Sequence, residues 1–141
     1  MVEIKLVESD DEIMSCFDVA VQLRTQYNRE SFVKQVQKQM LSGYQLVSLK
    51  SNNEICALAG FRYSENLAWG KFLYVDDLIT SIDHRSKGYG KKLLAWLIQQ
   101  AEENECQQLE LDSGVQRKDA HRFYLREKMR NSSLHFSISL P

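Results

Sequence analysis

The residues that could do chemistry gather in one segment, where a predicted strand passes through a glycine-containing loop into a predicted helix. The loop and the helix start read Arg85-Ser86-Lys87-Gly88-Tyr89-Gly90-Lys91-Lys92. N–H groups in the first turn of a helix have no intrahelical partner, and the helix dipole places positive partial charge there. The glycines let the backbone approach a ligand, and the basic side chains add positive charge. The segment therefore indicates a phosphate or pyrophosphate site, the alternative being two turn glycines beside a solvated basic helix start.

Other glycine-loop motifs fit this segment less well. A nucleotide-binding P-loop needs glycine where Arg85 stands and serine or threonine at Lys92, and a dinucleotide fingerprint needs glycine at Leu93. The residues Lys87-Gly88-Tyr89-Gly90 do satisfy the first four positions of an RNA-recognition signature. That signature continues as an exposed aromatic strand, whereas this sequence continues with helical spacing. An RNA-binding domain therefore stays the less favoured alternative.

Ten elements are expected to position this loop. Alternating or continuous apolar runs predict strands over residues 2–7, 44–50, 55–63, 67–80, 108–112 and 133–140. Apolar residues at helical spacing predict helices over residues 9–27, 32–40, 90–101 and 117–128. The order β-α-α-β-β-β-α-β-α-β joins an antiparallel meander to a crossover helix. This order predicts an α/β (α+β mixed) fold. Its central sheet is mixed and mostly antiparallel, and helices cover the faces of the sheet.

Local signals add detail to this prediction. Ser9 and Glu12 have the spacing of a capping box at the start of the first helix, and Gly43 is a C-terminal stop for the second. The residues Ser51-Asn52-Asn53 have turn chemistry and predict a hairpin. Residues 133–140 alternate between apolar and polar side chains, so we expect a last strand there, which could pair with a second copy in a homodimer.

Composition narrows the class of protein. The chain has 141 residues, 18 basic against 19 acidic side chains and 43% hydrophobic residues, which predicts one globular domain over residues 1–141. The net charge of −1 removes the electrostatic case for a general binder of nucleic acid or anionic membranes. The three cysteines lack metal-ligand spacing, so reduced thiols and no metal are expected. A secretion signal is not apparent, and a cytoplasmic location is expected.

The segment Arg85-Ser86-Lys87-Gly88-Tyr89-Gly90 resembles the Arg/Gln-x-x-Gly-x-Gly/Ala motif of the GNAT superfamily of acyl-CoA-dependent N-acyltransferases. The resemblance extends through the strand before the loop and the helix containing Asp119-Ala120-His121-Arg122-Phe123-Tyr124. It covers residues 70–140, and the element order of the N-terminal half also fits the family's fold.

The resemblance implies where coenzyme A would lie. Backbone groups of Leu78, Ile79 and Thr80 would pair with the pantetheine arm, as an added strand would. Loop residues would hold or flank the pyrophosphate, namely Arg85, Ser86, Lys87, Gly88, Tyr89, Gly90 and Lys91.

In the last helix, Tyr124 matches the tyrosine that gives a proton or hydrogen bond to the departing thiolate in many family members. Because the ordinary pKa of tyrosine lies above that of a thiol, a hydrogen bond to developing charge is the favoured role. Phe123 and Arg117 would contact the cofactor, although Arg117 stands where the family commonly has asparagine. Lys128 stands where glycine is frequent, so the helix must end differently.

The resemblance implies direct transfer of an acetyl group from acetyl-CoA to a primary amine, on a small molecule or a protein, with no metal, nucleic acid or membrane involved. A general base would assist deprotonation of the amine. Candidates are the carboxylates of Asp76, Asp77, Glu110, Asp112 and Glu30. Neighbouring residues of a regular strand point to opposite faces, so at most one of the first two should face the substrate. The main alternative is a non-catalytic acyl-CoA-binding or regulatory module of the same fold.

Overall fold

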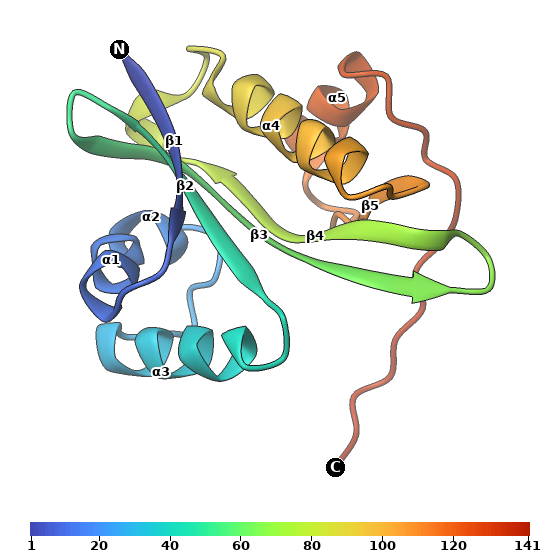
Figure 1. Ribbon diagram of the computed structural model, residues 1–141, viewed down its shortest axis with the longest axis horizontal. Helices are drawn as coiled ribbons and strands as arrows, with labels where there is room; N and C mark the ends of the chain where they lie inside the picture. The colour runs from blue at the N-terminus through green and yellow to red at the C-terminus, as the bar shows by residue number, and fades with distance from the viewer. The chain divides into compact units, whose positions relative to one another are not determined.

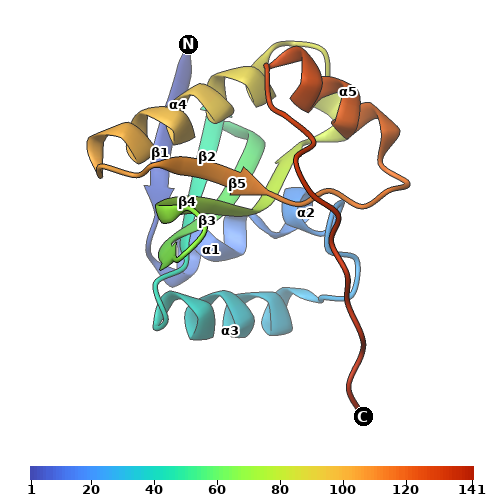
Figure 2. The same cartoon turned by 90° about the vertical axis from the view of Figure 1, so that its right-hand side faces the viewer.

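A five-stranded sheet organises the first part of the computed structural model, which describes residues 1–141 (Figure 1). The strands lie side by side in chain order, β1 (Val2–Val7), β2 (Gln45–Ser51), β3 (Glu54–Asn66), β4 (Gly70–Thr80) and β5 (Gln108–Leu111). Antiparallel pairing joins the first four. Helix α4 (Tyr89–Glu103) then crosses over to β5, which makes the sheet mixed (Figure 2). The predicted fold class is confirmed.

Helices cover both faces of this sheet (Figures 1 and 2). On one face lie α1 (Asp10–Ser15), α2 (Phe17–Ala20) and α3 (Arg29–Met40), whose apolar side chains share a buried core with Leu46, Leu58 and Ile79. On the other face α4 buries Leu93 and Leu97. A short 3₁₀ helix, η1 (Ile82–His84), lies between β4 and α4. None of the helices is long and apolar enough to cross a membrane.

The first predicted helix is shorter than expected. The capping box of Ser9 and Glu12 is present, but α1 ends at Ser15 and the chain leaves helical structure well before residue 27. At the end of α1 the carbonyl oxygen of Glu12 accepts bonds from Ser15 Oγ at 2.6 Å and Cys16 Sγ at 3.3 Å. These side chains compete with the backbone for that oxygen, which interrupts the helix although the apolar spacing continues.

The other N-terminal signals are confirmed. Gly43 has φ +101° just after α3, as a helix stop requires. Asn52 and Asn53 both have positive φ, at 53° and 62°, and they join β2 to β3 in a hairpin. Two successive left-handed residues give the turn the twist that antiparallel strands favour.

Residues Leu111–Pro141 form a second compact unit, after Met1–Glu110. It contains α5 (Lys118–Arg126), and residues 130–141 form neither helix nor strand. The predicted strand over 133–140 is therefore wrong. Alternation shows only that a segment could bury one face, whereas a strand also needs a neighbour to pair with its backbone, and the sheet ends at β5. A homodimer paired through this segment stays a prediction.

Candidate active site

The loop before α4 has an unusual backbone conformation at the start of the helix. Gly88 is the N-cap residue of α4, with φ +80°, and no side chain caps this helix end. A Cβ on Gly88 would meet no atom within 4 Å, so glycine is needed there for its backbone conformation and not for space. Ser86 also has positive φ, at 66°. The uncapped N–H groups at the positive end of the helix dipole therefore lie beside two residues in the left-handed conformation. This geometry is suited to an anion.

The charges around this loop are mostly positive. Arg85, Lys87, Lys91 and Lys92 flank the two glycines, and no acidic residue lies in the first turn of α4. His84, at the end of η1, lies with Nε2 3.0 Å from Glu54 Oε1 and with Nδ1 3.4 Å from Lys87 Nζ. Lys87 thus contacts His84, whereas Arg85, Lys91 and Lys92 are in no ion pair and stay available to a ligand at the helix start.

The last three residues of β4 are those expected to pair with the pantetheine arm. One backbone edge of Leu78, Ile79 and Thr80 pairs with Ala59, Leu58 and Ala57 of β3. On the other edge, the N–H of Gln107 donates to the carbonyl of Lys71 at 2.7 Å, so β5 starts beside the beginning of β4. Because β5 has four residues, it ends before Leu78 and leaves that edge without a neighbouring strand.

A β-bulge lies in β4 at the two predicted aspartates. Gly60 of β3 pairs with Asp77, whereas Phe61 pairs with Val75, so Asp76 has no partner in β3. An extra residue in one strand turns two successive side chains towards one side. Asp76 and Asp77 accordingly line the same cavity. The expectation that these two neighbours point to opposite faces assumed a regular strand, and that assumption is wrong because β4 is not regular there.

This cavity has a volume of about 490 Å³ and lies between α3 and the adjoining face of the sheet. Its apolar lining includes Phe32, Leu46 and Leu58. A cavity of this size is within the range of small-molecule sites. Of the five candidate bases, Asp76 and Asp77 line it. The other three are not among its lining residues. Glu30 is in an exposed ion pair with Lys34, Glu110 is on β5, and Asp112 forms an ion pair with His135.

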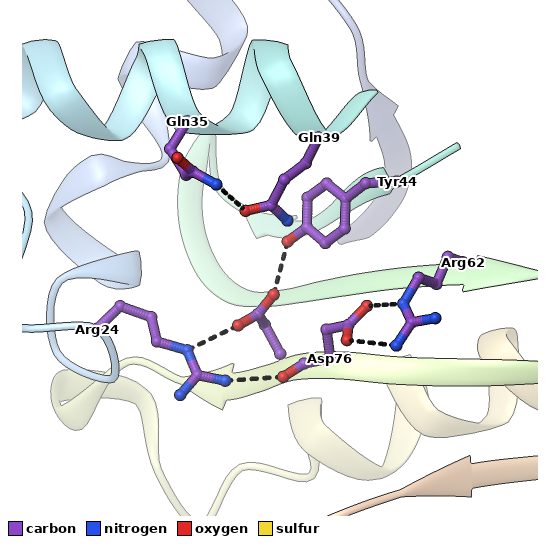
Figure 3. Close-up of polar contacts among 7 residues, drawn as sticks. Arg24, Gln35, Gln39, Tyr44, Arg62 and Asp76 are labelled. Carbon is purple, nitrogen blue, oxygen red and sulfur yellow. Dashed lines mark hydrogen bonds and ion pairs between the residues drawn. The ribbon is translucent and has the colours of Figure 1, made fainter. Parts of the chain in front are cut away.

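Two arginines and a tyrosine hold the aspartates (Figure 3). Asp77 accepts from Tyr44 Oη at 2.7 Å and from Arg24 Nε at 2.8 Å, and Arg24 Nη2 also donates to the carbonyl of Asp76 at 2.8 Å. Arg62 donates to both oxygens of the Asp76 carboxylate, at 3.0 and 3.3 Å. Burial raises the pKa of Tyr44 well above its ordinary value, and the Asp77 carboxylate raises it further. Tyr44 therefore stays a neutral donor to Asp77.

Gly60 makes room for this arrangement. A Cβ at Gly60 would lie 1.7 Å from Tyr44 Oη and 2.7 Å from Asp77 Oδ2. A glycine inside a strand often marks such a close approach. The sequence motifs did not predict Arg24, Tyr44 and Arg62 as site residues. The available signal was Gly60, a glycine in the middle of an otherwise apolar strand, which indicates that another group approaches the backbone closely there.

The predicted residues of the last helix lie in the second unit. Burial raises the pKa of Tyr124, and the positive charge of Arg117 and its hydrogen bond lower that pKa in part. The ring of Phe123 lies 5.5 Å from that of Tyr124, centroid to centroid. Lys128 has φ +71° and ends α5 in the left-handed conformation that glycine usually adopts. The helix therefore ends as it would with glycine, at a cost in backbone strain.

Comparison with known proteins identifies the family. Residues 10–129 match the acetyltransferase (GNAT) family. The chain belongs to the GNAT family. The uncharacterized N-acetyltransferase YhdJ of Bacillus subtilis is 36% identical to this GNAT protein over 128 residues, which cover 88% of each chain. An aminoalkylphosphonate N-acetyltransferase of Salmonella typhimurium is 35% identical over 66 residues, 47% of this chain and 43% of the relative.

Solved structures share the GNAT fold at low sequence identity. The ribosomal-protein-alanine N-acetyltransferase of Brucella melitensis has a TM-score of 0.85 and 16% identity, over 99% of this chain and all of the other. The aminoglycoside N-acetyltransferase AAC(6')-Iy, in complex with CoA, has a TM-score of 0.87 and 8% identity, over 99% and 95% of the two chains. The likeness to these structures concerns the fold. No group of three or more His, Cys, Asp or Glu side chains could hold a metal ion.

Proposed function

We propose that this GNAT enzyme transfers an acetyl group directly from acetyl-CoA to a primary amine. One observation supports the proposal: a single stretch of chain, from Asp76 to Gly88, runs from the cavity to the start of α4. It begins with two carboxylates in a cavity, continues through an edge of β4 without a strand neighbour, and ends at an uncapped helix start. The carboxylates suit the amine, and the helix start suits an anionic donor.

The loop residues fit the pyrophosphate of coenzyme A. The first-turn N–H groups of α4, after the left-handed Gly88, would donate to phosphate oxygens. Arg85, Lys87 and Lys91 would balance the phosphate charge. Acetyl-CoA would supply the acyl group, and Leu78, Ile79 and Thr80 would pair with its pantetheine arm. The family's structure with CoA supports this use of the fold.

The amine must lose a proton before it can act as a nucleophile. For an amine with a pKa near that of lysine, about 10.4, deprotonation at pH 7 costs roughly 4.6 kcal/mol. We propose that Asp76 or Asp77 orients the ammonium group and accepts its proton, directly or through water. Tyr44 and Arg24 fix the Asp77 carboxylate, whereas Arg62 fixes that of Asp76. Held carboxylates lose less entropy when they bind the amine.

Tyr124 would act on the departing thiol. Because burial raises its pKa, the phenol keeps its proton at neutral pH. Its proposed role is a hydrogen bond to charge developing on sulfur, with Phe123 and Arg117 beside the cofactor. This proposal requires the two compact units to act together as one domain.

A small amine is favoured as the acceptor. The cavity volume suits a small molecule, and the Salmonella relative is named for aminoalkylphosphonates. A cytoplasmic location is proposed, supported by three free cysteines, which are typical of a reducing compartment.

Calorimetry and thioester consumption test the function. Acetyl-CoA is expected to bind, and its thioester to be consumed with at least one small primary amine. Replacing the proton acceptor, through Asp76→Asn or Asp77→Asn, is expected to lower kcat by about 10²-fold or more. Glu30→Gln is the matched control, because this exposed carboxylate lies outside the cavity. No binding of acetyl-CoA or CoA would refute the proposal, and binding without consumption across the amine panel would indicate a non-catalytic module.

A further inference from the structure

The cavity that holds the two aspartates carries an excess of positive charge. Its charged lining consists of the carboxylates of Asp76 and Asp77 against the side chains of Arg24, Arg62 and Lys38. Each carboxylate is already paired with a guanidinium. Lys38 has no ion pair of its own. An acceptor that brought only positive charge would therefore enter a cavity that is already slightly positive.

Both guanidinium groups keep donors for a ligand. A guanidinium has five N–H donors, and Arg24 and Arg62 each direct two nitrogen atoms at the aspartates. Both side chains are still partly open to solvent, with exposed fractions of 45% and 44%. Arg62 is also held in place by the ring of Tyr74, 4.8 Å from its guanidinium carbon. A fixed, half-exposed guanidinium with unused donors suits a carboxylate or a phosphonate.

The arrangement places opposite charges next to each other. In Figure 3, Arg24 and Arg62 lie on opposite sides of Asp76, with Tyr44, Gln35 and Gln39 above. The carboxylates retain lone pairs after accepting from the arginines and the tyrosine. An ammonium group at the aspartates would thus lie within a few ångströms of either guanidinium.

We propose that the acceptor is a small amine that carries an anionic group, a carboxylate or a phosphonate, two or three carbons from its nitrogen. Its ammonium would lie at Asp76 and Asp77, and its anion would bind a guanidinium, with Lys38 adding charge at the rim. This substrate class rests on the proposed transfer of acetyl to an amine. A plain alkylamine would gain only the ammonium contact, and a diamine would place a second cation among the arginines.

Matched amines on short carbon chains test the proposal. β-Alanine and aminoethylphosphonate carry an anion, propylamine carries none, and diaminopropane carries a second amine. The kcat/KM for thioester consumption is expected to be at least tenfold higher for an anionic acceptor than for propylamine, and lowest for diaminopropane. The first two acceptors distinguish a carboxylate from a phosphonate site. Calorimetric binding of the same four amines to the CoA-saturated protein gives a second readout that needs no turnover.

Lys38→Gln is the most direct variant, because it removes a cavity cation without leaving a buried carboxylate unpaired. It is expected to lower the preference for the anionic acceptor about threefold to tenfold. Lys34→Gln is the matched control, one turn away on α3, outside the cavity and in an exposed pair with Glu30. It should leave the preference within twofold of the unmodified protein.

Equal or better use of propylamine or diaminopropane would overturn this substrate class while leaving acetyl transfer intact. No binding preference for the anionic amines would also overturn it. Failure of acetyl-CoA to bind or react would instead contradict the proposed function. Calorimetric binding of the same four amines to the protein without CoA would then still decide the substrate class.

Discussion

The substitution Gly60→Ala tests whether the aspartate arrangement depends on a missing side chain. The new Cβ would lie 1.7 Å from Tyr44 Oη, whereas real contacts are hardly ever under 3.0 Å. The hydroxyl must therefore move by more than 1 Å. Its hydrogen bond to Asp77 Oδ2 is 2.7 Å long and cannot survive that movement unless Asp77 shifts as well.

The expected loss of stability has two parts. A buried hydroxyl left without a partner costs about 1–3 kcal/mol, and Tyr44 is 7% exposed. Forcing a methyl group into a packed site costs another 1–3 kcal/mol or so. Together they predict that Gly60→Ala lowers the free energy of unfolding by about 2–6 kcal/mol. The kcat of any acetyl transfer should fall as well, because the Asp77 carboxylate loses one of the two side chains that donate hydrogen bonds to it.

Urea unfolding measures this loss, with Gly43→Ala as the control. Gly43 has φ +101° and open space around a Cβ. Alanine there should therefore lower the free energy of unfolding through backbone strain alone, by about 1–2 kcal/mol. Gly60 has no such strain, and its loss would come from the clash. If Gly60→Ala unfolded within 0.5 kcal/mol of the unmodified protein, the close approach of Tyr44 would not exist and the description of the cavity would be wrong.

Substitutions at three further positions probe other parts of the chain. Gly88→Ala should weaken CoA binding in calorimetry about tenfold, because alanine resists φ +80° although it has room, and Gly88→Asn should bind better than Gly88→Ala. Lys128→Gly should raise Tm by about 2–4 °C in thermal unfolding, because it removes a strained left-handed residue; an unchanged Tm would contradict that strain. The backbone N–H of Ser9, followed by that of Glu8, lowers the pKa of Glu12 to about 2. Since the folded pKa lies below the unfolded one, this carboxylate stabilises the protein above about pH 4.5, and the stabilisation is lost as pH falls towards 2. The stability difference between the unmodified protein and Glu12→Ala should therefore shrink over that pH range, and a constant difference would refute the charge-dependent part.

Local sequence signals predicted most of the fold. The capping box, the Asn52-Asn53 turn and the apolar stripe of α4 act over a few residues, so the physics that forms them is visible in the sequence. The two errors depended on distant or competing groups. The first helix was interrupted by side chains that bond the carbonyl of Glu12, and residues 133–140 alternate without a strand to pair with.

The candidate site also has a part that local sequence signals predicted and a part that they did not. The loop at Gly88 was predicted because its glycines and basic residues are contiguous. Arg24, Tyr44 and Arg62 were missed because their bonds to the aspartates span 53, 33 and 14 residues of sequence. No periodicity in a single chain records such pairs.

The bulge in β4 explains why the hydrophobic pattern could not reveal the site. In a regular strand, Leu73, Val75, Asp77 and Ile79 would all face one side. Val75 pairs with Phe61, whose ring packs on Trp96 of α4, whereas Ile79 pairs with Leu58 in the core beneath α3.

One unpaired residue, Asp76, therefore moves the strand's apolar side chains from one core to the other. At the point of change both aspartates face the cavity, and Gly60 opposite them leaves space for Tyr44. The same irregularity that lets β4 serve two hydrophobic cores thus brings two carboxylates to one surface, a few residues before the loop that suits the anionic donor.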